Sequence, residues 1–237
     1  MHTREPNSGR TRTLINGANA APKPDPLQGL RYIDVTHRKY NAVKRIFDIC
    51  ISLAAIIVLA IPMAVIMLLV YIDDPGKVIF AQERIGYRGK IFRIYKIRTM
   101  VAAAPGNLSA EEFRDADRYV TRMGALLRKA SLDELPQLLN VLKGEMSIIG
   151  PRPLIAEESR IHELRTKYGV YQTRPGITGL AQINGRNNIS TKNKVRWEVK
   201  YLENYGFFTD FKILFNTVPK IICGVDVVKN FDSKPGA

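Results

Sequence analysis

Residues 49–71, ICISLAAIIVLAIPMAVIMLLVY, form an apolar run in which no side chain is charged. At about 1.5 Å per helical residue, this run is long enough to cross a hydrocarbon core of roughly 30 Å. Pro62 lies near its middle, where a proline removes one backbone hydrogen bond and crowds the preceding helical turn. The sequence therefore predicts a membrane helix with a break or kink at Pro62.

The charges on either side of this run leave two topologies open. Residues 1–47 carry a net charge of +6 out of the total of +14, so both flanks are basic. A spanning helix normally leaves its more basic flank in the cytoplasm, whereas a re-entrant helix that turns at Pro62 would keep both flanks there. The residues favour the re-entrant helix only slightly. It would place Lys44, Arg45 and Asp48 at the membrane interface, where long basic side chains reach water and lipid phosphate.

The rest of the chain predicts an α+β fold that is mainly helical. Residues 1–40, rich in proline and polar residues, are typical of a flexible N-terminal arm. Short β-strands and a hairpin turn are expected between residues 78 and 97, and helices at 118–130, 135–142 and 157–169. From about Val195, aromatic residues alternate with lysines, which is typical of amphipathic helices in a membrane interface or of core packing.

Composition narrows the classes of partner. A net charge of +14 favours polyanions: nucleic acid, an anionic membrane or phosphorylated substrates. The basic residues are spread along the chain and form no recognised nucleic-acid-binding motif, so we do not expect nucleic acid. The two cysteines, Cys50 and Cys223, lie far apart, and no His or Cys pair has metal-ligand spacing. The sequence therefore predicts no zinc site.

The segment RKASLDELPQ, which begins at Arg128, supports two compatible interpretations. Ser131 followed three residues later by Glu134 matches a capping box at a helix start. Alternatively, Asp133 is a nucleophile that attacks phosphorus, with Arg128 and Arg152 placed to hold a phosphate. A Mg²⁺ ion held by carboxylate and diphosphate oxygens would offset the charge repulsion in such a site.

Several motifs in series resemble the bacterial sugar transferase family, the monotopic phosphoglycosyl transferases. They are SLDELPQLLNVLKGEMSIIGPRPL at residues 131–154 and RPGITGLAQINGRN at 174–187. KRIFDI, the proline-containing apolar run and QERIGYRGKIFRIYKIRTM precede them in the family's order. The resemblance covers about residues 40–220. It implies a re-entrant membrane helix over 41–72, a catalytic domain over 73–225 and a C-terminal tail over 226–237.

The resemblance also implies roles for individual residues. Asp133 would be the nucleophile that forms a covalent phosphosugar intermediate and releases UMP, and Glu134 would assist it and share the binding of Mg²⁺. Arg152, in the Gly-Pro-Arg-Pro motif, would hold a phosphate. The helix-breaking proline is often preceded by serine in the family, whereas Ile61 precedes Pro62 here. This departure weakens the expected local hydrogen bond at the break.

Further contacts are expected in the same site. The wall of the nucleotide-sugar site would be formed by Arg174, Gln182, Asn184 and Arg186, with Arg128 also binding substrate. A basic stripe could bind carrier phosphate or lipid head groups, or could be solvated; its members are Arg84, Arg88, Lys90, Arg93, Lys96 and Arg98.

The expected function is transfer of a sugar-1-phosphate from a UDP-sugar to polyprenyl (undecaprenyl) phosphate at the cytoplasmic face of a bacterial inner membrane, which would initiate glycan assembly. The expected partners are the UDP-sugar, polyprenyl phosphate and membrane lipids, and self-association is left open. Alternatives are a non-catalytic scaffold of a glycan assembly complex and a glycosyltransferase that releases UDP. The NGRN segment suggests an N-acetylated amino sugar, with hexoses also open.

Overall fold

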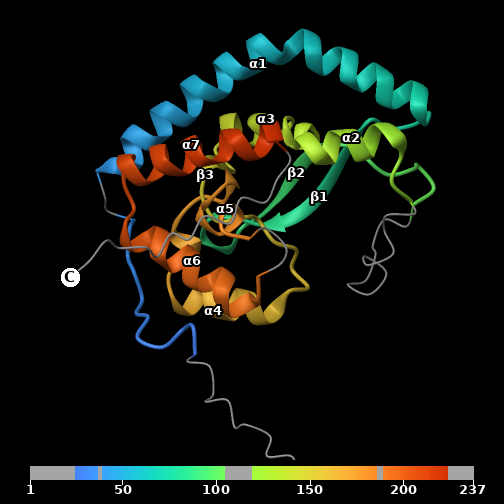
Figure 1. The fold of residues 1–237 in the computed structure, drawn as a ribbon. Coiled ribbons are helices and arrows are strands. Elements are labelled where there is room, and N and C mark those ends of the chain that lie inside the picture. Colours follow the sequence, from blue (N-terminus) through green and yellow to red (C-terminus); the bar gives the residue numbers. More distant parts are fainter. Residues whose placement is uncertain (1–24, 37–38, 105–118, 186–188, 224–237) are drawn as a thin grey trace, which may run out of the picture.

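The computed structural model describes residues 25–36, 39–104, 119–185 and 189–223, with side chains as far as Pro219. The fold is mainly helical α+β with small sheets (Figure 1). Its elements are α1 (Tyr40–Asp73), β1 (Ile79–Ile85), η1 (Tyr87–Gly89), β2 (Ile91–Ile97), α2 (Arg122–Ala130), η3 (Leu132–Glu134), α3 (Gln137–Lys143), β3 (Ser147–Ile149), α4 (Ser159–Lys167), η4 (Val170–Gln172), β4 (Gly176–Thr178), α5 (Leu180–Ile183), α6 (Thr191–Glu203) and α7 (Phe207–Cys223).

The predicted hairpin is confirmed, and a second sheet was not foreseen. β1 and β2 pair antiparallel, from Ile79 opposite Ile97 to Ile85 opposite Ile91. The second sheet is a parallel pair of three-residue strands, β3 and β4, too short for a period-2 pattern to show in the sequence.

α1 is the helix of the described residues that is long and apolar enough to cross a membrane. Its most apolar window has a mean hydropathy of 3.1, and only 6% of that window is buried inside the protein. This exposure distinguishes α1 from the core helix of a soluble protein and indicates membrane association. The helix continues through Pro62 and arches away from the rest of the fold (Figure 1). Of the predicted break or kink at Pro62, the break is therefore wrong, since one curved helix runs through the proline.

The first turns of α1 are fastened to the folded domain. Lys44 Nζ lies 2.5 Å from Asp210 Oδ2 on α7, and both side chains are buried. Arg45 donates to the last carbonyls of α3 at 2.6 and 2.9 Å. Asp48 Oδ1 accepts a hydrogen bond from Ser147 Oγ at 3.0 Å. The domain, rather than water or lipid phosphate, thus supplies the partners of these three side chains, and their place at the membrane interface stays a prediction.

The last turn of α1 is held by the same domain. Asp73 Oδ2 accepts a hydrogen bond from the backbone of Met123, at the start of α2, at 3.3 Å. Asp74, which follows the helix, forms an ion pair with Arg98 at 3.2 Å and accepts from the backbone of Ala102 at 2.7 Å. Both ends of the apolar helix are thus attached to one domain.

The main hydrophobic core lies among α4, α5, α6, α7 and the short parallel sheet. Residues 25–36 join it: Val35 is fully buried, and the backbone of Ile33 donates to the carbonyl of Tyr168 at 3.4 Å. The expected flexible arm is therefore wrong for residues 25–36, whose leucine, isoleucine and valine side chains bury apolar surface. Residues 1–24 and the predicted tail at 226–237 lie outside the described residues.

Some of the C-terminal aromatic residues pack in the core, and others are exposed as an interfacial helix would require. Tyr201 and Tyr205 of the α6 region are buried in the core. Phe208, Phe211 and Phe215 are exposed and follow one another at helical spacing on α7. α7 lies with α3 and α2 in a layer beneath the arch of α1 (Figure 1). Core packing thus holds for α6, whereas α7 presents an apolar surface.

Candidate active site

Asp133 and Glu134 lie in η3, a tight turn between α2 and α3. Ser131 ends α2 in the left-handed conformation, with φ of 56°, and its N–H bonds back to the carbonyls of Leu127 and Arg128. Its side chain makes no capping hydrogen bond to η3, so the predicted capping box is wrong. A left-handed residue at the end of a helix redirects the chain. This reversal places both carboxylates at the junction of two helices.

Two basic residues from distant segments meet these carboxylates. Lys96, on β2, places Nζ 2.7 Å from Glu134 Oε1 and 3.7 Å from Asp133 Oδ2. Arg152, in the Gly-Pro-Arg-Pro loop, places Nη2 3.0 Å from the same Glu134 oxygen. Asp133 itself is 8% exposed. The structure therefore brings Asp133, Glu134 and Arg152 together as predicted.

The pKa values of the two adjacent carboxylates are shifted in opposite directions. Burial raises the pKa of Asp133, and the charges of Lys96 and Arg128 only partly offset this. Burial also opposes ionisation of Glu134, but Arg152 and Lys96 outweigh it and lower the pKa of Glu134 to about 2. Glu134 is thus a fixed anion within an ion-pair network, while Asp133 is the more basic carboxylate. Opposed shifts of this kind are typical of catalytic pairs.

The loop that carries Arg152 is held by close backbone packing and a buried ion pair. A Cβ at Gly176 would lie 2.1 Å from the backbone nitrogen of Gly150, so glycine is required where these loops cross. Arg165 Nη2 donates to the carbonyl of Arg152 at 2.9 Å, and its Nε donates to Glu198 Oε2 at 2.8 Å. Arg165 and Glu198 are both buried. They position Arg152 without facing the carboxylate pair, a role that no local sequence signal revealed.

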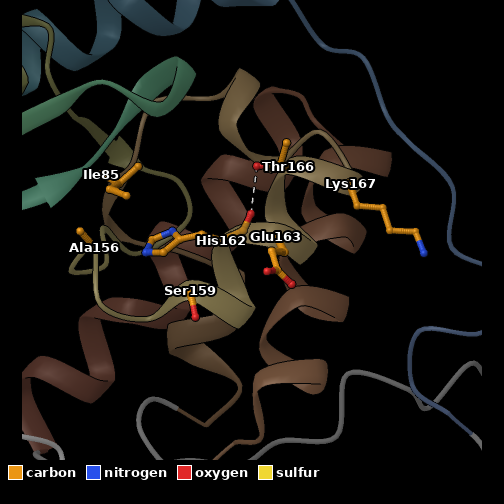
Figure 2. A pocket seen from close by; sticks show the side chains of 7 residues that line it. All are labelled: Ile85, Ala156, Ser159, His162, Glu163, Thr166 and Lys167. Carbon is orange, nitrogen blue, oxygen red and sulfur yellow. Dashed lines mark hydrogen bonds between the residues drawn. The ribbon is translucent and has the colours of Figure 1, made fainter.

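Apart from the carboxylate cluster, a wide hollow lies at the end of β1 and along α4 (Figure 2). It has a volume of about 640 Å³ and is lined by Ile85, Ala156, Ser159, His162, Glu163, Thr166 and Lys167. His162 is fixed there, because its Nε2 contacts the carbonyl of Ile155 at 2.6 Å and its Nδ1 contacts the Tyr171 hydroxyl. The lining carries one acidic side chain, Glu163, and one basic side chain, Lys167. The cluster around Glu134 is the better match for a diphosphate, because it concentrates positive charge.

Comparison with known proteins gives the family. The family model described as bacterial sugar transferase matches residues 39–224. This chain belongs to the bacterial sugar transferase family. The matched range contains α1, the β1–β2 hairpin and the whole Asp133 site, so the protein is an enzyme of the sugar transferase type.

Three relatives illustrate the similarity. The chain is 38% identical to the exopolysaccharide production protein ExoY of Sinorhizobium fredii over 192 residues, 75% of this chain and 84% of that protein. It is 41% identical to the uncharacterized sugar transferase EpsL of Bacillus subtilis over 182 residues, 76% of this chain and 87% of that protein. It is 38% identical to the UDP-glucose:undecaprenyl-phosphate glucose-1-phosphate transferase of Caulobacter vibrioides over 187 residues, 76% of this chain and 69% of that protein.

The donor set of this sugar transferase site is compatible with a magnesium ion that is shared with substrate. Within the described ranges, no group of three or more His, Cys, Asp or Glu side chains could hold a metal ion. Asp133 and Glu134 offer two adjacent carboxylates, and Lys96 and Arg152 both engage the same oxygen of Glu134. Mg²⁺ is usually bound by one or two carboxylates together with substrate phosphates and water. The pair therefore fits Mg²⁺ only in company with a diphosphate.

The other predicted substrate-binding residues lie in varied surroundings. Arg128 Nε donates to Thr99 Oγ1 at 2.8 Å, and its charge acts on Asp133. Arg174 Nε donates to the carbonyl of Gly144 at 2.9 Å, and its guanidinium lies over the ring of Tyr87.

Two predicted wall residues make backbone contacts near their own position. Gln182 Nε2 donates to the carbonyl of Ile177 at 3.4 Å, and Asn184 Nδ2 donates to the carbonyl of Leu180 at 2.7 Å. Arg186 lies outside the described residues. Substrate contacts by Arg174, Gln182, Asn184 and Arg186 stay predictions.

The residues of the predicted basic stripe point to different faces of the hairpin and have different partners. Lys96 contacts the carboxylate pair, and Arg98 pairs with Asp74. Arg93 pairs with Glu83 at 3.7 Å on the exposed side. Successive side chains of a strand point to opposite faces. Applying this alternation to residues 91–97 would have singled out Lys96 from the sequence.

Proposed function

We propose that this protein transfers a sugar-1-phosphate from a UDP-sugar to undecaprenyl phosphate, releases UMP and so initiates polysaccharide assembly. The observation that carries the proposal is a buried Asp133, whose pKa is raised, beside a Glu134 that two basic residues keep ionised. The name of the Caulobacter relative describes the same reaction with UDP-glucose as donor. The sugar that this chain transfers is left open between hexoses and N-acetylated amino sugars.

The transfer would proceed in two steps at the same carboxylate. In the first, an oxygen of ionised Asp133 bonds to the β-phosphorus of the donor, and the bond from that phosphorus to the bridging oxygen breaks. The electron pair leaves with UMP. In the second, a phosphate oxygen of the dianionic carrier attacks the same phosphorus and the bond to Asp133 breaks, which restores the carboxylate. Neither step needs a net proton. The raised pKa of Asp133 makes its carboxylate the better nucleophile, and the charge of Lys96 favours the ionised form that attacks.

The other side chains would bind the anionic substrates. Arg152 and Lys96 would hold diphosphate oxygens, and Glu134 would keep both cations in place. Asp133 and Glu134 would hold Mg²⁺ together with the diphosphate, and the ion would neutralise part of the combined negative charge. Arg165 would hold Arg152 in position through its hydrogen bond to the backbone carbonyl of Arg152.

The same proposal includes a re-entrant α1 at the cytoplasmic face of the inner membrane. A straight helix of 34 residues would be about 51 Å long, far more than one leaflet. Instead, the helix arches, and both of its ends are attached to one domain through Asp210, Ser147 and Met123. A spanning helix would carry its ends to opposite sides of the bilayer. Attachment of both ends to the same domain supports entry and exit on one side.

The deciding experiment is the identity of the released nucleotide. Detergent-solubilised protein would be incubated with undecaprenyl phosphate, Mg²⁺ and a panel of UDP-sugars. We expect UMP with at least one donor, its loss in Asp133→Asn, and full activity in Glu83→Gln, an exposed acid of the hairpin that serves as control. Release of UDP would indicate ordinary glycosyl transfer. Failure of every donor to yield a nucleotide would favour a non-catalytic scaffold.

A further inference from the structure

A small cavity lies next to the carboxylate pair. It has a volume of about 20 Å³ and is lined by Arg84, Ile94, Lys96, Glu134, Gln137, Arg152 and Pro153. About one water-sized sphere fits in such a space. The cavity is therefore too small for a phosphate group but large enough for one of its oxygen atoms.

Two buried N–H groups of the lining residues have no hydrogen-bond partner among the residues that the structure describes. Gln137 is 2% exposed, and its Nε2 makes no hydrogen bond. Arg84 donates from Nη2 to Gln82 Oε1 at 2.6 Å, but its buried Nε is unpaired. A buried donor without a partner costs about 1–3 kcal/mol. The fold thus keeps two unsatisfied donors at the walls of one cavity.

The charge of the lining also favours a negative occupant. Arg84, Lys96 and Arg152 contribute three positive charges, and Glu134 contributes one negative charge. Burial, together with the charge of Arg152, lowers the pKa of Arg84. Glu157 and Glu158 also act on Arg84, but burial and Arg152 prevail, so an anionic oxygen in the cavity would relieve the repulsion between the two arginines and satisfy the unmet hydrogen bonds.

We propose that this cavity is an oxyanion hole, in which Gln137 Nε2 and Arg84 bind one non-bridging oxygen of the phosphoryl group that Asp133 attacks. This proposal rests on the proposed function. The negative charge of that group is spread over its non-bridging oxygens in the transition state, where fixed donors in a dry site stabilise it most. No bond to the bound oxygen forms or breaks, so the balance of the two transfer steps is unchanged. Gln137 and Arg84 would then be catalytic residues that act on the transferred group.

The test compares Gln137→Leu and Arg84→Gln with a control, Glu83→Gln, an exposed acid of the same hairpin. Leucine has nearly the shape of glutamine but removes the unpaired donor. We expect Gln137→Leu to lower kcat by about 10²–10³-fold with little change in KM, and to leave the melting temperature unchanged or raised. A purely structural glutamine would instead lower the melting temperature. Glu83→Gln should retain the wild-type kcat.

A second measurement needs no substitution. A donor with sulfur in place of one non-bridging oxygen on the β-phosphorus exists as two diastereomers, and only one would direct sulfur into this small cavity. Wild-type protein should discriminate strongly between them, and Gln137→Leu should discriminate less. Wild-type kcat in both variants and equal use of the two diastereomers, with UMP still released, would overturn the oxyanion hole while leaving the proposed function intact. If wild-type protein releases no UMP from any donor, both proposals fall.

Discussion

Neutralising Asp133 and neutralising Glu134 should change the stability of the fold in opposite directions, although both changes should abolish transfer. Asp133→Asn removes a charge that burial disfavours, since the pKa of Asp133 is raised in the folded protein. We therefore expect this variant to melt at a higher temperature than the wild type near neutral pH. Glu134→Gln removes a charge that Arg152 and Lys96 stabilise, and should melt at a lower temperature.

The magnitude for Glu134 follows from its pKa. A decrease from the usual value of 4.5 to about 2 corresponds to about 3 kcal/mol of stability, at 1.36 kcal/mol per pKa unit. This contribution is fully present above about pH 4.5 and is lost as the pH falls toward 2. For a chain of this size, 1 kcal/mol shifts the melting temperature by about 2–4 °C. Glu134→Gln should therefore lower it by up to about 12 °C at pH 7.

The assay is thermal unfolding of purified protein in detergent, followed by the fluorescence of Trp197. This is the sole tryptophan of the chain, and it packs against the main core. UMP release is measured on the same samples, so that loss of activity is separated from loss of fold. A shift of the two variants in the same direction, or a change in Glu134→Gln of under about 1 kcal/mol, would refute the assigned electrostatics.

Three further outcomes follow from other parts of the structure. UMP release should decline as the pH falls through the raised pKa of Asp133, so its acidic limb should lie above the usual aspartate value of 3.8, as a pH–rate profile would show. Lys44→Met leaves Asp210 buried without its ion pair and should destabilise the fold by about 3–5 kcal/mol, whereas Lys44→Met with Asp210→Leu should recover part of this loss in the same melting assay. In a variant whose Cys50 and Cys223 are replaced by serine, a fluorophore attached to Phe208→Cys should be quenched by brominated lipids in vesicles, and one at Glu83→Cys should not.

The features that could be predicted from the sequence are those with a local pattern. The apolar run gives α1, because its length and lack of charge are visible within residues 49–71. Alternation of apolar and basic residues gives β2, and glycines mark the turn before it. The Asp133–Glu134 pair was recognised from a continuous motif. The first two inferences need only neighbours within one element, and the third needs only residues that are adjacent along the chain.

The sequence did not reveal contacts that join two distant segments. Lys44 and Asp210 are separated by 166 positions, and Asp48 and Ser147 by 99, so nothing near α1 indicated that its charges would be buried. Ser131 was assigned to a helix start because its spacing to Glu134 is that of a capping box. In the structure Ser131 instead ends α2 in a left-handed conformation, and its N–H bonds back to that helix.

The position of Asp133 bears on why a two-step transfer suits this protein. η3 joins α2 to α3, and these helices expose Leu126 and Leu139 in the layer over which α1 arches. If α1 enters the membrane as proposed, the carrier phosphate can approach this junction while its chain stays in the bilayer. The UDP-sugar is water-soluble and must arrive from the aqueous side. A carboxylate that retains the phosphosugar while UMP departs lets the two anionic substrates use the site in turn, and avoids placing both diphosphate and carrier phosphate against it at once.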